Sequence, residues 1–234
     1  MSRLLLLTLL VSAVSAQQAP RIGVVRDDSG RLQRVVGLAG SFVVQNDDLH
    51  VLAAASSGRE AILKTAEELI ITDGDGRRLT ALSAPPGPAN FAFAKDGSAA
   101  LVWFASTREL CRLPSGRPLP WQPSGEVVAI GWPNRAIVRR EDRLWLLDGA
   151  IEVPLQGLEA PAALLADGRI VASRGASVVV IGLDGGEREI FLEANPSRLE
   201  VMGEQWIAIA AGDHSYALRL SSEPTVYLLP RSAQ

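Results

Sequence analysis

A hairpin pattern that recurs along the chain constrains its fold more than any other feature of the sequence. Each copy is an apolar run, a short turn that usually contains glycine, and a second apolar run. The clearest copies span residues 69–79, 144–153 and 178–190, and weaker copies span residues 22–36, 110–119 and 216–229. Glycine between apolar runs predicts a tight hairpin because it accepts the positive φ that such turns require. The chain is therefore expected to repeat one structural unit.

The spacing of the hairpins predicts the size of this unit. The intervals between successive turn residues are 46, 40, 33, 37 and 36 residues, counted along Gly30, Gly76, Gly116, Gly149, Gly186 and Ser222. Helical repeats share this period. Prolines nevertheless punctuate the connecting segments, as in the Pro-Pro-Gly-Pro run at residues 85–88, and leave little room for helix pairs. The repeat is therefore expected to consist of strands.

Two further strands precede most hairpins. They are predicted at residues 90–94 and 99–105, 127–131 and 135–139, 162–166 and 169–173, and 198–202 and 205–210. Each unit then has four strands in up-and-down order, which is the blade of a β-propeller.

Two segments carry a resemblance to known blades. Residues 91–98, Phe-Ala-Phe-Ala-Lys-Asp-Gly-Ser, are similar to the F-S-P-D-G opening of such blades, and residues 144–148 are similar to the third strand of a WD blade. The chain thus resembles secreted bacterial β-propellers with WD40-like and YVTN-like repeats. It contains no Gly-His or Trp-Asp dipeptide, so the hydrogen-bonded network of WD40 blades is not carried over.

The fold expected from these features is all-β, a β-propeller of about five to six four-stranded blades preceded by a signal peptide. The expected units are residues 17–36, 37–86, 87–122, 123–159, 160–193 and 194–230. The first is a lone hairpin, which either pairs with the last unit or forms a partial sixth blade. Residues 40–66 leave two alternatives, because Ser57 and Glu60 match a helix capping box, but strands are favoured there since the neighbouring units are strands.

The N-terminus predicts an exported protein. Arg3 is followed by an apolar run over residues 4–11 and by small residues at Val14-Ser15-Ala16, which is the order of a secretory signal peptide. The apolar run is too short to span a bilayer. We expect cleavage after Ala16 and a single mature domain over residues 17–234, periplasmic or extracellular, without an integral membrane anchor.

Charge and cysteine content restrict the partners. Loss of Arg3 with the signal peptide leaves 22 of the 23 basic residues against 26 acidic residues, so nucleic acid is an unfavourable partner. Cys111 is the only cysteine, which rules out an intrachain disulfide. Its strand-like surroundings favour a small apolar role over a reactive one.

Candidate chemical groups are few. His50 and His214 are the only histidines, and neither has metal ligands at a suitable spacing. Residues 73–76, Asp-Gly-Asp-Gly, match only part of a calcium loop, because two arginines follow where ligands would be needed. Tryptophans could form a rim that stacks on carbohydrate or peptide, although blade cores also use them. They are Trp103, Trp121, Trp132, Trp145 and Trp206.

The leading functional hypothesis is an exported noncatalytic binding or scaffold module that contacts a protein or a small ligand. The alternative is a propeller enzyme acting on glycans through paired carboxylates, and a third hypothesis is a structural role in a surface assembly. The sequence identifies no catalytic residue, no metal ligand and no cofactor site, and it leaves the binding residues unknown.

Overall fold

A computed structural model describes residues 19–230, and the predicted signal peptide, residues 1–16, lies outside this range. The described residues form six antiparallel sheets. The first sheet is β1 (Arg21–Arg26), β2 (Arg31–Leu38) and β3 (Ser41–His50). The second is β4 (Ala53–Ser56), β5 (Glu60–Lys64), β6 (Glu68–Asp73) and β7 (Arg78–Ser83), and the third is β8 (Ala89–Phe93), β9 (Ala100–Phe104), β10 (Glu109–Leu113) and β11 (Arg117–Leu119).

The remaining sheets repeat this order. The fourth is β12 (Glu126–Gly131), β13 (Arg135–Arg140), β14 (Arg143–Asp148) and β15 (Ile151–Leu155). The fifth is β16 (Glu159–Leu164), β17 (Ile170–Arg174), β18 (Ser177–Ile181) and β19 (Glu187–Phe191). The sixth is β20 (Pro196–Gly203), β21 (Trp206–Ala211), β22 (His214–Arg219) and β23 (Thr225–Leu228).

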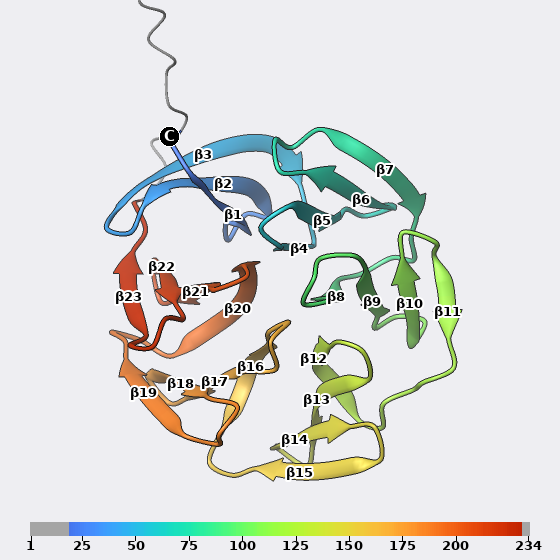
Figure 1. The fold of residues 1–234 in the computed structure, drawn as a ribbon, viewed down its shortest axis with the longest axis vertical. Coiled ribbons are helices and arrows are strands. Elements are labelled where there is room, and N and C mark those ends of the chain that lie inside the picture. Colours follow the sequence, from blue (N-terminus) through green and yellow to red (C-terminus); the bar gives the residue numbers. More distant parts are fainter. Residues whose placement is uncertain (1–18, 231–234) are drawn as a thin grey trace, which may run out of the picture.

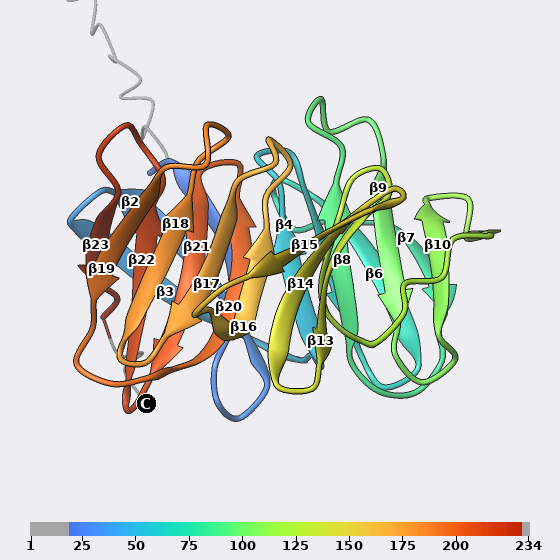
Figure 2. The same ribbon diagram turned by 90° about the horizontal axis from the view of Figure 1, so that it is seen from below.

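The sheets are arranged radially around a central axis as the blades of a six-bladed β-propeller (Figure 1). Seen from the side, the strands run between the two faces of the ring (Figure 2). Every blade is one continuous stretch of chain with its strands in sequence order. The all-β class and the propeller architecture expected from the sequence are confirmed.

The first blade has three strands and lacks an innermost one. Five strands, β4, β8, β12, β16 and β20, surround the axis and contact their neighbours in turn, whereas β1 packs against both β4 and β20 (Figure 1). The N-terminal hairpin therefore belongs to a partial blade, β1 to β3, which brings the number of blades to six. A partial sixth blade was one of the two expected alternatives.

The expected division between units 17–36 and 37–86 is wrong. Residues 41–50 belong to the first blade as β3, because the Ala39-Gly40 turn folds them back onto β2 with Leu38 opposite Ser41. The second blade begins only at Ala53.

Residues 53–64 form strands, as favoured, and the serine of the capping-box pattern closes a hairpin. Ser57 Oγ accepts hydrogen bonds from the backbone N–H groups of Arg59 at 3.3 Å and Glu60 at 3.1 Å. A serine hydroxyl can satisfy backbone donors in a turn as well as at a helix start, which explains the ambiguity of the sequence.

Side chains cap the edge of β1 where an inner strand is missing. The N–H of Val24 donates to Ser56 Oγ at 3.1 Å, and this hydroxyl donates to the carbonyl of Met202 at 2.7 Å. The N–H of Arg26 donates to Glu200 Oε2 at 3.4 Å. Ser56 thus joins the first, second and sixth blades at the point where the ring closes.

We expect Ser56→Ala to lower the free energy of unfolding by about 2 kcal/mol, because it leaves the N–H of Val24 buried without an acceptor. Urea denaturation measures this change. Ser222→Ala, at an exposed turn position, is the matched control and should change the stability by less than about 0.5 kcal/mol. Equal stabilities of the two variants would show that the Ser56 hydroxyl does not hold the ring closed.

The apolar core is divided among the blade boundaries. Each of six clusters of buried side chains packs between two neighbouring blades, including the one between the last blade and the first. This arrangement follows from strands that are apolar on both faces of the sheet, since each sheet is covered on both sides. The ring is therefore stabilised around its whole circumference.

Arginines reinforce these boundaries. Arginines donate across a boundary to a backbone carbonyl in several places, for example Arg34 to Asp75 at 3.1 Å, Arg135 to Gly168 at 3.2 Å, Arg169 to Leu220 at 2.7 Å and Arg198 to Arg26 at 2.8 Å. At the boundary between the third and fourth blades, the Arg112 guanidinium lies 5.3 Å from the centre of the Trp132 ring. Arginine suits this role because its rigid fork of donors reaches carbonyls and stacks on aromatic faces.

Candidate functional site

The centre of the ring is lined by small side chains. The five inner strands surround a cavity of about 170 Å³, and five strands can converge on one axis only where their side chains are short. Seven of the nineteen lining residues are alanines, namely Ala53, Ala54, Ala55, Ala89, Ala129, Ala162 and Ala163. The polar residues of this lining are Asn90 and the charged Arg26, Arg198 and Glu200.

The mouth at the N-terminal ends of the inner strands carries a buried ion cluster. Glu200 Oε1 lies 3.0 Å from Arg26 Nε and 3.6 Å from Arg198 Nε. Burial raises the pKa of the Glu200 carboxyl, although the Arg198 and Arg26 guanidinium groups lower it. Arg26 also donates to the carbonyl of Leu52 at 2.7 Å. Because these groups join β1, β20 and the start of the second blade, their contacts account for ring closure.

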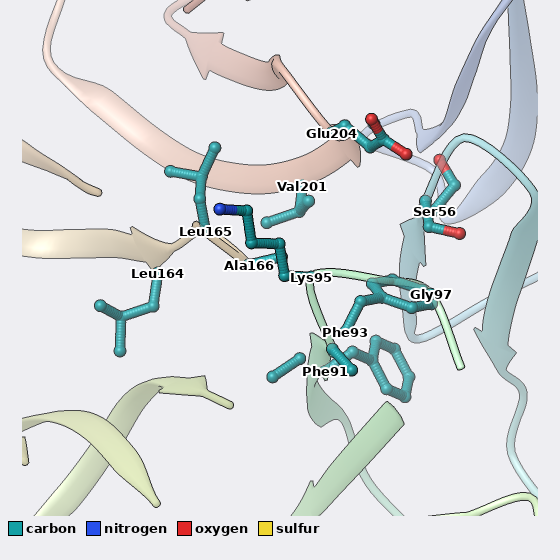
Figure 3. A pocket seen from close by; sticks show the side chains of 14 residues that line it. Ser56, Phe91, Phe93, Lys95, Gly97, Leu164, Leu165, Ala166, Val201 and Glu204 are labelled. Carbon is teal, nitrogen blue, oxygen red and sulfur yellow. The ribbon is translucent and has the colours of Figure 1, made fainter. Parts of the chain in front are cut away.

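The mouth at the C-terminal ends of the inner strands, here called the carboxyl-end mouth, is different (Figure 3). Phe91, Phe93 and Val201 line an apolar depression, and Lys95 and Glu204 stand at its edge. Both charged residues are exposed, and neither makes a hydrogen bond or ion pair within residues 19–230. This mouth therefore offers charged groups that the fold itself does not use.

The turns that carry these two residues occupy equivalent places in their blades. Lys95 follows β8 and Glu204 follows β20, and both turns link the first strand of a blade to its second. In an up-and-down blade, such turns lie on one face of the ring. The equivalent places of Lys95 and Glu204 in the repeat are therefore the sequence signal that locates both residues at one mouth.

The structure does not bring the two histidines together. His50 ends β3 and lines a cleft between the first two blades. His214 begins β22, where its Nδ1 lies 3.5 Å from Glu193 Oε2. Among the described residues, no group of three or more His, Cys, Asp or Glu side chains could hold a metal ion.

The tryptophans pack at blade boundaries. Trp103, Trp121, Trp132 and Trp145 belong to the cluster between the third and fourth blades. Trp206 packs edge-on against Phe42, with the ring centres 5.7 Å apart. None of the five lines either mouth of the channel, so the structure gives no support to an aromatic rim around the axis.

The acidic turn at residues 73–76 has a structural explanation. Asp73 Oδ1 accepts hydrogen bonds from the N–H groups of Asp75 at 2.9 Å and Arg77 at 2.8 Å. Asp27, Asp167 and Asp184 bond the backbone of their own turns in the same way. A short side chain that accepts from the residues that follow is typical of such turns, so a calcium ion is not needed to explain the pattern.

No helix within residues 19–230 is long and apolar enough to cross a membrane. No family model matches the chain, and no curated protein matches it either.

Solved structures share the fold at low sequence identity. A protein of unknown function from Bacteroides caccae has a TM-score of 0.54 at 14% identity, covering 86% of this chain and 90% of that one. PorZ, an essential bacterial surface component of the type IX secretion system of Porphyromonas gingivalis, has a TM-score of 0.55 at 14% identity, covering 92% of this chain but 39% of that one. The Neurospora crassa Pan2 WD40 domain has a TM-score of 0.51 at 10% identity, covering 91% and 80%. These likenesses establish the propeller fold alone.

Proposed function

We propose that this protein is an exported noncatalytic binding module and that its partner docks at the carboxyl-end mouth. The observation that carries the proposal is the pair Lys95 and Glu204, two exposed charges without a structural partner in residues 19–230, beside an apolar depression. Apolar surface with a few convergent polar groups is typical of a binding site.

The alternative, a glycan-acting enzyme, needs two carboxylates at one site, roughly 5 to 10 Å apart. The described residues that line the channel contribute Glu200 at one mouth and Glu204 at the other. Glu200 is also engaged by Arg26. A binding module therefore agrees better with this geometry.

Export rests on the N-terminal sequence, in which residues 4–11 and Val14-Ser15-Ala16 match a secretory signal. The shared fold with PorZ, which is described as a bacterial surface component, is compatible with an extracytoplasmic location. The mass of the exported chain tests this part of the proposal, with residues 17–234 as the expected product.

Site-specific photocrosslinking in the producing cells tests the binding proposal. A benzoylphenylalanine at position 166 should capture a partner, because Ala166 lines the same mouth and its replacement leaves Lys95 and Glu204 in place. The matched control is the same probe at position 188, on the exposed outer strand β19, and it should capture none.

The charge reversal Glu204→Lys should abolish the crosslink from position 166 without changing the thermal stability, since Glu204 has no structural ion pair within the described residues. Equal capture from positions 166 and 188, or capture that survives the reversal, would contradict docking at this mouth.

A further inference from the structure

A second cavity lies away from the channel, between the outer halves of the second and third blades. It has a volume of about 350 Å³, within the usual range for small-molecule sites. It exists because the outer strand β11 has only three residues, so β10 is left uncovered beside Leu113. Pro118 further limits the pairing of β11, since proline has no N–H to donate.

The walls of this cavity are apolar and deeply buried. Leu69, Val102 and Leu113 are 1%, 0% and 3% exposed, and Phe104 and the Cys111 thiol complete the inner surface. All five belong to the apolar cluster between these two blades. These side chains form the floor beneath the cleft, and Leu82, Pro85 and Pro118 form its accessible apolar wall. An apolar ligand packed against this wall would extend the core.

The rim of the cavity carries one charge. Glu109 is exposed and makes no ion pair within residues 19–230. Burial raises the pKa of the Cys111 thiol, and the nearby negative charge of Glu109 raises it further. No basic residue lines the cavity, so the electrostatic complement of this site is a cation.

We propose that this cleft binds a small apolar molecule that carries one positive charge, with the apolar part against Leu82 and Pro118 and the cation beside Glu109. This site is independent of the carboxyl-end mouth, so either proposal can fail without affecting the other.

The test uses 4-phenylbutylamine as the probe and 4-phenylbutyrate as a control of matched size and opposite charge. The amine should raise the melting temperature of the mature protein in proportion to the logarithm of its concentration above the Kd. It should also slow the alkylation of Cys111 by N-ethylmaleimide. The butyrate should do neither.

Three variants locate the effect. Glu109→Gln should weaken amine binding about two- to fivefold, as expected for an exposed ion pair. Its matched control, Glu159→Gln, changes an exposed glutamate at the start of β16 and should leave binding unchanged. Cys111→Leu should abolish the thermal shift by filling the cleft, and Leu82→Phe fills it from the opposite wall if Cys111→Leu does not fold.

Equal shifts with the amine and the butyrate would overturn the proposal. So would an amine shift that persists in both filled variants, or the absence of any shift in the wild-type protein at millimolar amine.

Discussion

Replacing Gly23 by alanine is expected to lower the free energy of unfolding by about 4 kcal/mol, among the largest effects of a single substitution. A Cβ atom at this position would lie 1.6 Å from the carbonyl oxygen of Met202 and 2.6 Å from Ser56 Oγ. The oxygen belongs to the backbone of β20, so it cannot turn away as a side chain would. Strand β1 would have to move away from β20 and break the contacts that close the ring. Thermal and urea denaturation measure the loss.

Gly74→Ala is the matched control for this prediction. Its new Cβ would meet only the carbonyl oxygen of Arg59, at an ordinary contact distance of 3.4 Å. We expect its stability to remain within about 0.5 kcal/mol of the wild type. If Gly23→Ala were equally harmless, the close approach of β1 to β20 would not be needed for the folded state.

Glu200→Ala should lower the free energy of unfolding by about 3 kcal/mol at neutral pH. The substitution removes the acceptor for the N–H of Arg26 and leaves the guanidinium groups of Arg26 and Arg198 without their shared carboxylate. Glu200→Gln should be less damaging, because its amide oxygen can still accept from the backbone. If both variants lost the same stability, the effect would come from the charge alone.

The pH dependence distinguishes burial from ion pairing at Glu200. Burial raises the pKa of this carboxyl in the folded state above its ordinary value of 4.5, so the folded protein takes up the proton at a higher pH than the unfolded chain does. As the pH falls from the raised pKa to about 4.5, wild type should therefore gain stability relative to Glu200→Gln. Urea titrations at several pH values measure this difference. A relative loss of stability in acid would show that the two arginines outweigh burial.

The repeat made most of the fold predictable, because the hairpin signals are local. Residues 69–79 and 178–190 carry glycine turns between apolar runs, and both form the expected hairpins. The assignment of residues 41–50 failed because the expected boundary lay between residues 36 and 37, whereas the Ala39-Gly40 turn folds the next strand back onto β2. A hairpin links its strands by local chemistry, whereas membership of a blade depends on which neighbour the strand pairs with.

The closure of the ring was not predictable from the sequence. Gly23 lies in an ordinary apolar strand pattern, and the need for glycine arises only from the approach of Met202, far along the chain. Glu200 likewise places a charged side chain within a strand, and only its ion pair with Arg26 explains why it is there. The position of Lys95 and Glu204 at one mouth follows from their equivalent turns in the repeat, but the lack of a structural partner for either charge within residues 19–230 is visible only in the folded ring.

The side-chain closure also determines the order in which the molecule can assemble. Each blade is made of neighbouring hairpins and can form from local contacts as soon as its own residues are available. The bonds that close the ring instead join residues 146 and 174 positions apart. The edge of β1 therefore stays open until β20 has been made and, for an exported chain, has crossed the membrane. A chain stopped after the fifth blade would present an unpaired strand edge, which is the feature that chaperones and aggregating partners recognise.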